Sequence, residues 1–537
     1  MYDLKIVNGA IIDGRGFQSY SADIGIANGR IVAIGKLESE AASIIDASGL
    51  TVSPGFIDLH THSDASFLID PSADSKVRQG CTLELAGNCG MSFCAPVQGA
   101  AVEQSEQRWQ MYGPDIAINQ PENTLHWRSF GDYMDTLDSK GSTLNIASQV
   151  GHGTIRAGVI GFDDRAPTVD EITSMATLVS ESLDAGALGF STGLFYAPGS
   201  YARTDEIVVL AREAAKKNKL YSTHMRDESN YSISLIGSIE ESISIGRLSG
   251  ARVQISHLKC LGPETWGQAA ELLSRIEHAR NESIDVAGDQ YPYTAGSTNI
   301  TGAIFPRWTQ TGGREGTLKK LSDESLYPSI VEGIAADIER RGGADKIVIA
   351  NYPSDRSLEG KNLAEIAEKL GNSPSEVAIM IYRESETSVI LHSMDEPDVE
   401  IIAQGKWVSV ASDGSSIKTS GVLSTGKPHP RSYGTFPRFL ARYVRERCVV
   451  SLEEAIRKMT SLPASRLNLS QRGAILPGFW ADIVIFDPAK IMDTATFASP
   501  HSYATGIPHV MVNGVQVVNN GTLTNERPGK VIRRFDG

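Results

Sequence analysis

Two histidines separated by one residue, His60 and His62, directly follow the short apolar run at residues 56–57. In a β-strand, residues two apart point to the same side, so both imidazoles can face one metal ion. Imidazole and carboxylate groups that converge on one point are typical of a one- or two-metal hydrolytic centre. Three further side chains of this kind each end an apolar run that resembles a strand: His224, His257 and Asp413.

The elements that must position these side chains alternate between apolar runs and helical stretches about every 30 residues. One helix is expected from a Thr168 cap to a Gly186 stop. This rhythm predicts βαβ units and a parallel sheet, best as a TIM-like (β/α)8 barrel and second as a doubly wound sheet. The expected strands lie at residues 56–59, 83–86, 144–147, 188–191, 220–223, 253–256, 284–287 and 408–411, with further candidates at 347–350 and 389–391.

The candidate ligands stand at the carboxyl ends of these expected strands, the face on which barrels build their active sites. His224 and His257 are 33 residues apart, one βα module, which places them on neighbouring strands. For any one histidine, hydrogen bonding within a core is the competing interpretation. The position of the whole set favours a metal centre.

Both ends of the chain predict β-structure, because short apolar runs there flank Asn8-Gly9, Asn28-Gly29 and Asn513-Gly514, and Asn-Gly is a strong hairpin signal. We expect residues 1–53 and 470–537 to pair into one small β-sandwich domain beside a catalytic barrel at 54–469. Two unrelated hairpins are the alternative. Residues 101–128 and 299–345 break the alternation and are expected to be insertions, the second a lid over one barrel face.

Composition limits the possible partners and location. The 537 residues include 50 Lys and Arg against 64 Asp and Glu, a formal net charge of −14, which argues against nucleic acid and anionic membranes as partners. No apolar run approaches the roughly 20 residues that span a bilayer, and no secretory signal is recognisable. Five cysteines in so long a chain favour a reducing compartment, so we expect a cytoplasmic enzyme.

Longer motifs extend the argument. Residues 54–62, Pro-Gly-Phe-Ile-Asp-Leu-His-Thr-His, resemble the opening motif of the amidohydrolase superfamily. The resemblance to one family in it, the N-acyl-D-amino-acid deacylases (D-aminoacylases), runs from Asn8-Gly9 to residues 481–484. The motifs that carry it, in family order, are Gly87-Asn88-Cys89-Gly90, Ser222-Thr223-His224-Met225-Arg226, Ser256-His257-Leu258-Lys259, Tyr291-Pro292-Tyr293 and His429-Pro430-Arg431-Ser432-Tyr433-Gly434-Thr435-Phe436-Pro437-Arg438.

This resemblance implies a zinc site with two metal positions and Cys89 as the bridging ligand. The position held by Cys89 with His224 and His257 would bind zinc tightly, and the occupancy of the other is left open. A thiolate is a soft ligand that suits zinc. The other four cysteines are expected to be small buried apolar residues. The second position is implied to consist of His60, His62 and Asp413.

The resemblance also implies roles in hydrolysis. Asp413 would act as general base and acid, taking a proton from metal-activated water and passing it to the leaving amine. Lys259, Tyr291 and Arg431 would hold the α-carboxylate of a small N-acyl amino acid, since Arg binds carboxylates through two parallel hydrogen bonds. His152 also belongs to a family-like motif, but no chemical role follows for it. The oligomeric state is not readable.

The function implied is hydrolysis of N-acyl-D-amino acids to a carboxylic acid and a D-amino acid. The alternatives are a cyclic-amide hydrolase of the hydantoinase or dihydroorotase kind, and a non-catalytic scaffold with the same fold. Cys89 and Arg431 argue against the first, and the complete ligand set argues against the second. No cation occurs between Gly296 and Arg307, so a pocket edged by Ile300, Ala303 and Ile304 would favour neutral side chains.

Overall fold

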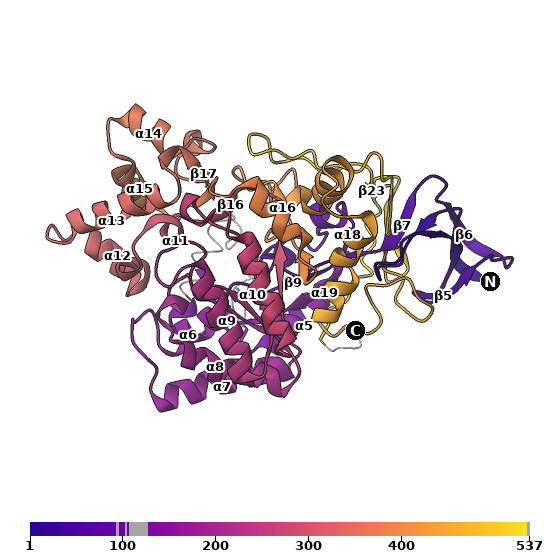
Figure 1. Cartoon of the computed structure of the whole chain (residues 1–537), viewed down its shortest axis with the longest axis horizontal. Helices are drawn as coiled ribbons and strands as arrows, with labels where there is room; N and C mark the ends of the chain where they lie inside the picture. Colours follow the sequence, from indigo (N-terminus) through magenta and orange to yellow (C-terminus); the bar gives the residue numbers. More distant parts are fainter. Residues whose placement is uncertain (93–95, 103–104, 107–126, 534–537) are drawn as a thin grey trace.

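A ring of parallel strands forms the centre of the protein. The computed structural model describes residues 1–92, 96–102, 105–106 and 127–533 (Figure 1). A strand forms at each of the eight main runs expected from the sequence. The strands are β8 (Phe56–Asp58), β9 (Cys81–Ala86), β10 (Asn145–Ser148) continued by β11 (Val150–Gly151), β12 (Gly189–Gly193), β13 (Leu220–His224), β14 (Arg252–Ile255), β15 (Val286–Gln290) and β19 (Val408–Val410).

These strands pair in chain order. β8, β9 and β10 form one parallel sheet, and β11 to β15 with β19 form a second. The two sheets meet where β10 ends and β11 begins, with only Gln149 between them in the chain. At the other edge, the backbone N–H of Asp413 donates to His60 O at 2.9 Å, and Thr61 forms a parallel bridge with Gly414. The segments after the last and first strands are therefore joined, and the order is TIM-barrel-like.

Helices lie between the strands and cover them. In α7, Thr168 caps the first turn and exchanges hydrogen bonds with Glu171, as expected for this start. Its buried residues Met175, Val179 and Leu183 recur every four positions, which gives the helix one apolar face. The helices are α1 (Ser66–Ile69), α2 (Asp74–Val77), α5 (Phe130–Lys140), α6 (His152–Val159), α7 (Val169–Asp184), α8 (Thr204–Lys216), α9 (Leu235–Ser249), α10 (Ala269–Asn281), α16 (Glu396–Gln404), α17 (Arg431–Arg438), α18 (Leu452–Met459) and α19 (Ser461–Arg466).

Residues 296–391 form a separate layer, which we call the cap layer. Its antiparallel sheet has the order β16-β18-β17, so the runs at 347–350 and 389–391 form strands that do not belong to the parallel set. The layer extends beyond the expected range 299–345 and has a hydrophobic core of its own. Its elements are β16 (Gly296–Asn299), α11 (Ile300–Ile304), α12 (Gly313–Leu321), α13 (Tyr327–Arg340), β17 (Ile347–Asn351), α14 (Leu363–Leu370), α15 (Pro374–Glu384) and β18 (Ser388–Leu391).

Two sheets lie at the end of the molecule opposite the cap layer (Figure 1). One contains only N-terminal strands, while in the other the N-terminal β7 pairs antiparallel with the C-terminal β20. Most of the expected insertion at 101–128 lies outside the described residues. The strands of the two sheets are β1 (Tyr2–Val7), β4 (Asp23–Ala27), β5 (Arg30–Gly35) and β6 (Ala41–Asp46), and β2 (Ala10–Ile11), β3 (Tyr20–Ser21), β7 (Thr51–Pro54), β20 (Ile483–Phe486), β21 (His509–Val512), β22 (Val515–Asn519) and β23 (Thr522–Leu523).

Two of the three Asn-Gly pairs form the expected hairpins. Asn28-Gly29 and Asn513-Gly514 have positive φ at both residues, as a tight two-residue hairpin turn requires. The hairpin prediction at Asn8-Gly9 is wrong, because β1 and β2 belong to different sheets. Only Asn8 has a positive φ there, and the chain crosses between the sheets. Within the described residues, no helix is both long and apolar enough to cross a bilayer.

Candidate metal centre

The six candidate ligands lie together at the carboxyl ends of the parallel strands. Each follows or ends a different strand, except for the pair after β8. The set consists of His60 and His62 after β8, Cys89 after β9, His224 at the end of β13, His257 after β14 and Asp413 after β19.

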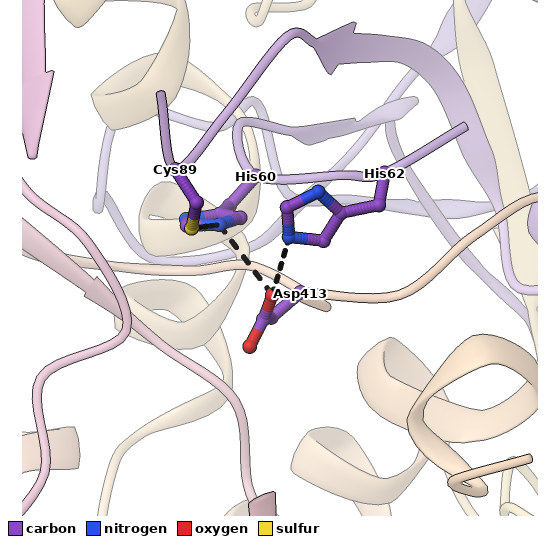
Figure 2. Close-up of side chains that lie close together, drawn as sticks. All are labelled: His60, His62, Cys89 and Asp413. Carbon is purple, nitrogen blue, oxygen red and sulfur yellow. Dashed lines mark hydrogen bonds and ion pairs between the residues drawn. The ribbon is translucent and has the colours of Figure 1, made fainter. Parts of the chain in front are cut away.

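Four of these side chains converge on one point (Figure 2). Asp413 Oδ1 lies 3.0 Å from His62 Nε2 and 3.5 Å from His60 Nε2. Cys89 Sγ lies 3.3 Å from the same nitrogen of His60. One ligand atom from each of the four lies within 4.8 Å of the others, a spacing that can surround one metal ion.

Cys89 also belongs to a second group. Its Sγ lies 3.4 Å from His257 Nε2 and 3.7 Å from His224 Nδ1. The ligand atoms of these three residues again lie within 4.8 Å of one another. The thiol therefore stands between two groups of candidate ligands, the position in which the family resemblance implies a bridging ligand.

Three of the six residues have a left-handed backbone. The φ angles are 54° at Cys89, 35° at His257 and 50° at Asp413, a region that residues other than glycine seldom adopt. Close packing helps to hold Cys89 in place, since a Cβ on Gly193 would come within 2.2 Å of Cys89 O. Such strain persists only where the surroundings enforce it, and it clusters at functional sites.

The charges around the thiol and the carboxylate favour their ionised forms. Burial raises the pKa of Cys89, but neighbouring His60 and His257 outweigh it and hold that pKa well below its usual value. Burial likewise raises the pKa of Asp413, and Arg431 and His257 bring it well below its usual range. Both groups are thus set to act as anionic ligands.

Two buried carboxylates that the sequence argument missed contact the histidines from behind. Asp289 Oδ1 lies 3.2 Å from His60 Nδ1. Glu228 lies 3.0 Å from His257 Nδ1 and 3.5 Å from His224 Nε2. Metal-binding histidines usually give their second ring nitrogen to a carboxylate in this way. Together with the thiol, this donor set fits zinc.

Comparisons with known proteins agree with this geometry. A family model described as "Amidohydrolase family" matches residues 43–254 and 405–518. A D-aminoacylase of Alcaligenes xylosoxydans xylosoxydans is 35% identical over 99% of this chain and 98% of its own length. The chain belongs to the D-aminoacylase family of amidohydrolases.

Solved structures place the chain among the same amidohydrolases. An N-acyl-D-glutamate deacylase from Bordetella bronchiseptica, solved with zinc and a phosphonate inhibitor, superposes with a TM-score of 0.83 at 34% identity, covering 99% of this chain and all of that one. A D-hydantoinase structure has a TM-score of 0.56 at 16% identity, with 99% of each chain covered. The second similarity concerns the fold alone.

The three residues expected at the substrate carboxylate lie beside the ligands of this amidohydrolase. Arg431 Nη1 is 2.8 Å from Asp413 Oδ2, and its guanidinium stacks 4.9 Å above the Tyr291 ring. Tyr291 Oη is buried and has no hydrogen-bond partner among the described residues. The Lys259 ammonium contacts Glu228 at 2.6 Å and His257 Nδ1 at 2.8 Å, so it is already held by protein groups.

A buried lysine links the two segments that carry His60 and Asp413 in this amidohydrolase. Lys76, fully buried, donates to Asp58 Oδ2 at 2.6 Å and to Ser412 Oγ at 2.5 Å. Asp58 Oδ1 in turn accepts from the Ser412 backbone N–H at 2.9 Å. Asp58 stands two residues before His60, and Ser412 directly precedes Asp413. These hydrogen bonds hold together the two backbone segments that carry the candidate ligands His60 and Asp413.

His152 has a structural environment. It is fully buried, and its Nε2 lies 2.9 Å from Glu206 Oε1, which also accepts from Arg156 Nε at 3.2 Å.

Of the other four cysteines, Cys81 and Cys260 are buried as expected, but Cys448 is exposed and Cys94 lies outside the described residues. Of the described residues named here, neither His152 nor Cys81, Cys260 or Cys448 lines the cavity described next.

A cavity of about 580 Å³ opens at the metal centre, between the strand ends and the cap layer. The segments at the strand ends contribute Cys89, His257 and Asp413 to its lining. The cap layer contributes Asn299 and Thr301. The expectation that three apolar residues of α11 edge the pocket is wrong, since they pack into the core of the cap layer instead: Ile300, Ala303 and Ile304.

Proposed function

We propose that this chain is a zinc-dependent hydrolase that cleaves N-acyl-D-amino acids into a carboxylic acid and a D-amino acid. The observation that carries the proposal is the cluster of one thiol, four imidazoles and one carboxylate at the base of a cavity large enough for a small substrate. Full-length relatives with deacylase names support the substrate class.

We assign the tight zinc position to Cys89, His224 and His257. The second position takes His60, His62 and Asp413, with Cys89 between the two. When bound, zinc polarises the amide carbonyl and lowers the pKa of coordinated water toward about 7. Glu228 and Asp289 orient the imidazoles through their second nitrogens.

Asp413 acts on the proton. Its Oδ1 faces His62 and its Oδ2 faces Arg431, and the group is ionised, so it can accept the proton of the attacking water. It then delivers that proton to the amine nitrogen as the amide bond breaks. Hydrolysis needs this transfer because an amine leaves poorly as an anion.

Arg431, Tyr291 and Lys259 form the subsite for the α-carboxylate of the substrate. Arg431 offers a fork of donors, and the buried Tyr291 Oη has no partner within the described part of the chain. Lys259 contributes its charge from a fixed position beside Glu228. The occupant is a small molecule with at least one negative charge.

Replacing Arg431 with alanine is expected to lower kcat/KM for N-acyl-D-amino acids by at least about 10-fold more than for the corresponding amino-acid amides. The ratio matters because Arg431 also contacts Asp413, so the variant slows both substrates. Steady-state kinetics on an acid and amide pair measures it. Arg431→Lys keeps the charge, so its ratio of kcat/KM for the acid to that for the amide should lie between those of the wild type and Arg431→Ala. Equal losses for acid and amide would assign Arg431 a structural role.

The function itself is tested with a substrate panel. Purified protein is assayed for amine release from N-acetyl-D- and N-acetyl-L-amino acids, hydantoins and dihydroorotate, with zinc content measured on the same sample. We expect activity on the D-series with between one and two zinc ions per chain. Turnover restricted to cyclic amides would assign a hydantoinase-like reaction, and a metal-free inactive protein would indicate a scaffold.

We further propose that residues 1–53 and 470–537 form a small β-sandwich domain beside a barrel at 54–469. A hydrophobic cluster shared by both ends of the chain supports this division, since it includes Ile6, Ile24 and Ile483. The preference for neutral substrate side chains stays a prediction. The apolar residues on which it rested pack into the core of the cap layer instead of the cavity wall.

A further inference from the structure

His429 is a buried histidine at the cavity to which the proposed reaction gives no role. Only 3% of its surface is exposed, and it lines the cavity together with Arg431 and Tyr291. It belongs to neither group of candidate metal ligands among the described residues. Both nitrogens of its ring are instead engaged by backbone groups of the protein.

These two hydrogen bonds fix the tautomer of the ring. The backbone N–H of Arg431 donates to His429 Nδ1 at 3.0 Å, so Nδ1 carries no proton. The proton is therefore on Nε2, which donates to Ala295 O at 2.8 Å. Burial and the nearby Arg431 guanidinium hold the pKa of His429 well below its usual value. The ring thus stays neutral and keeps one acceptor and one donor.

The two bonds of His429 reach two different chain segments. Arg431 is the first residue of α17, and the N–H groups of a first helical turn have no partner within the helix. Ala295 directly precedes the cap layer, in the segment that follows β15 and begins with Tyr291. An imidazole carries its nitrogens on opposite edges of a rigid ring, so one side chain can connect both segments.

The side chain of Arg431 contacts the same segment. Its Nη2 donates to Ser297 O at 3.3 Å, and its guanidinium lies 4.9 Å from the centre of the Tyr291 ring. The His429 ring lies 6.1 Å from that ring. Arg431 is therefore held against the segment of Tyr291 twice, by its guanidinium and, through His429, by its backbone.

We propose that His429 is a positioning residue for the subsite of the substrate α-carboxylate. This inference rests on the proposed function and deepens it: His429 sets the position of Arg431 relative to Tyr291, so that both can contact one carboxylate. A two-bond contact with a carboxylate depends on geometry, and a displacement of about 1 Å can cost about 10²-fold in rate. Since both ring nitrogens of His429 are occupied, its effect on the substrate passes through Arg431.

Two substitutions separate the two hydrogen bonds. His429→Asn keeps an acceptor oxygen at the position of Nδ1, and His429→Gln keeps a donor nitrogen near the position of Nε2. kcat and KM are measured for N-acetyl-D-leucine and N-acetyl-D-leucinamide, or for the corresponding pair of the best substrate in the panel. We expect His429→Gln to raise KM for the acid about 10-fold more than KM for the amide, with kcat within about 3-fold of wild type. His429→Asn should keep most of the wild-type ratio of acid to amide.

His392→Asn is the matched control. The His392 ring packs against Phe497 at 4.7 Å between centres, and the His429 ring packs against the same residue at 5.0 Å, but His392 does not line the cavity. The control should keep the wild-type ratio, and the Tm of each variant shows that it folds. Equal effects on acid and amide in His429→Gln overturn the proposal, and so does a ratio that Gln preserves better than Asn.

A double variant tests whether His429 acts through Arg431. In the Arg431→Ala background, His429→Gln should leave the ratio of kcat/KM for acid to amide unchanged, because the guanidinium that His429 positions is absent. The loss in the double variant then equals the loss in Arg431→Ala alone. A further fall in the ratio, of the size seen for His429→Gln in the wild-type background, would contradict the proposal.

A binding measurement separates this inference from the proposed function. The rise in Tm caused by the acid and by the amide is recorded for the wild-type chain, His429→Gln and His429→Asn. A larger rise with the acid, reduced in the Gln variant and kept in the Asn variant, supports the positioning role even if neither compound is hydrolysed. Equal rises for acid and amide in the wild-type chain contradict it. Hydrolysis of the D-series with an unchanged ratio in His429→Gln would leave the proposed function intact and exclude this inference.

Discussion

Replacing Cys89 with alanine is expected to abolish tight zinc binding and, with it, nearly all hydrolysis. Sγ is the one ligand atom that both groups share, so its removal leaves two imidazoles at the tight position and separates the two positions. Loss of a residue that merely supports a ligand lowers metal affinity about 10- to 100-fold, and loss of the shared ligand should exceed this. Zinc per chain after dialysis against a weak chelator, with kcat on the same sample, measures the effect.

Cys81→Ala is the control for that variant. Cys81 is also buried and is the first residue of β9, whereas Cys89 follows the last residue of that strand. The control therefore removes a buried thiol from the opposite end of the same strand. This control should keep its zinc and its activity. Full zinc and normal kcat in the Cys89 variant would exclude Cys89 as a ligand.

Asp413→Asn is expected to lower kcat by at least about 10²-fold, because general acid–base catalysis contributes about 10²–10⁴-fold. The amide keeps nearly the same shape, and the backbone N–H of residue 413 still donates to His60 O, so the fold should persist. The variant loses the carboxylate that accepts the proton. It also loses the negative charge that faces His62 and Arg431. The measurement is kcat at saturating substrate, together with zinc content and Tm.

Zinc content separates two causes of a loss in the Asp413 variant. If zinc stays at the wild-type level while kcat falls, the deficit lies in proton transfer. A parallel loss of zinc would identify Asp413 as mainly a ligand. A kcat within about 3-fold of wild type would show that another group moves the proton.

Most of the central strands could be predicted from the sequence, because each combines an apolar run with a ligand or a turn at its carboxyl end. Residues 347–350 and 389–391 gave the same signal but pair antiparallel in the cap layer. An apolar run shows that a strand is buried, not which strand it pairs with or in which direction. The boundary of the cap layer was missed for this reason.

The clustering of the candidate ligands was predictable because histidine and cysteine are rare and stood in recognisable motifs. Glu228, Asp289 and Lys76 were not predicted, since each is a common charged residue that looks solvent-exposed in the sequence. Their importance comes from burial, which tertiary packing decides. Asp289 carried a weak signal, since it lies just beyond an expected strand end, two residues before Tyr291, which lines the cavity.

The separate hydrophobic core of the cap layer makes this fold modular in evolution. The candidate zinc ligands belong to the ends of the central strands, which the main hydrophobic core supports, whereas Asn299 and Thr301, which line the same cavity, belong to a layer with its own packing. Substitutions that repack residues 296–391 can therefore change which substrates enter without disturbing the groups that break the bond. A duplicated gene can acquire a new substrate by drift in this one segment, while its catalytic half stays under unchanged selection.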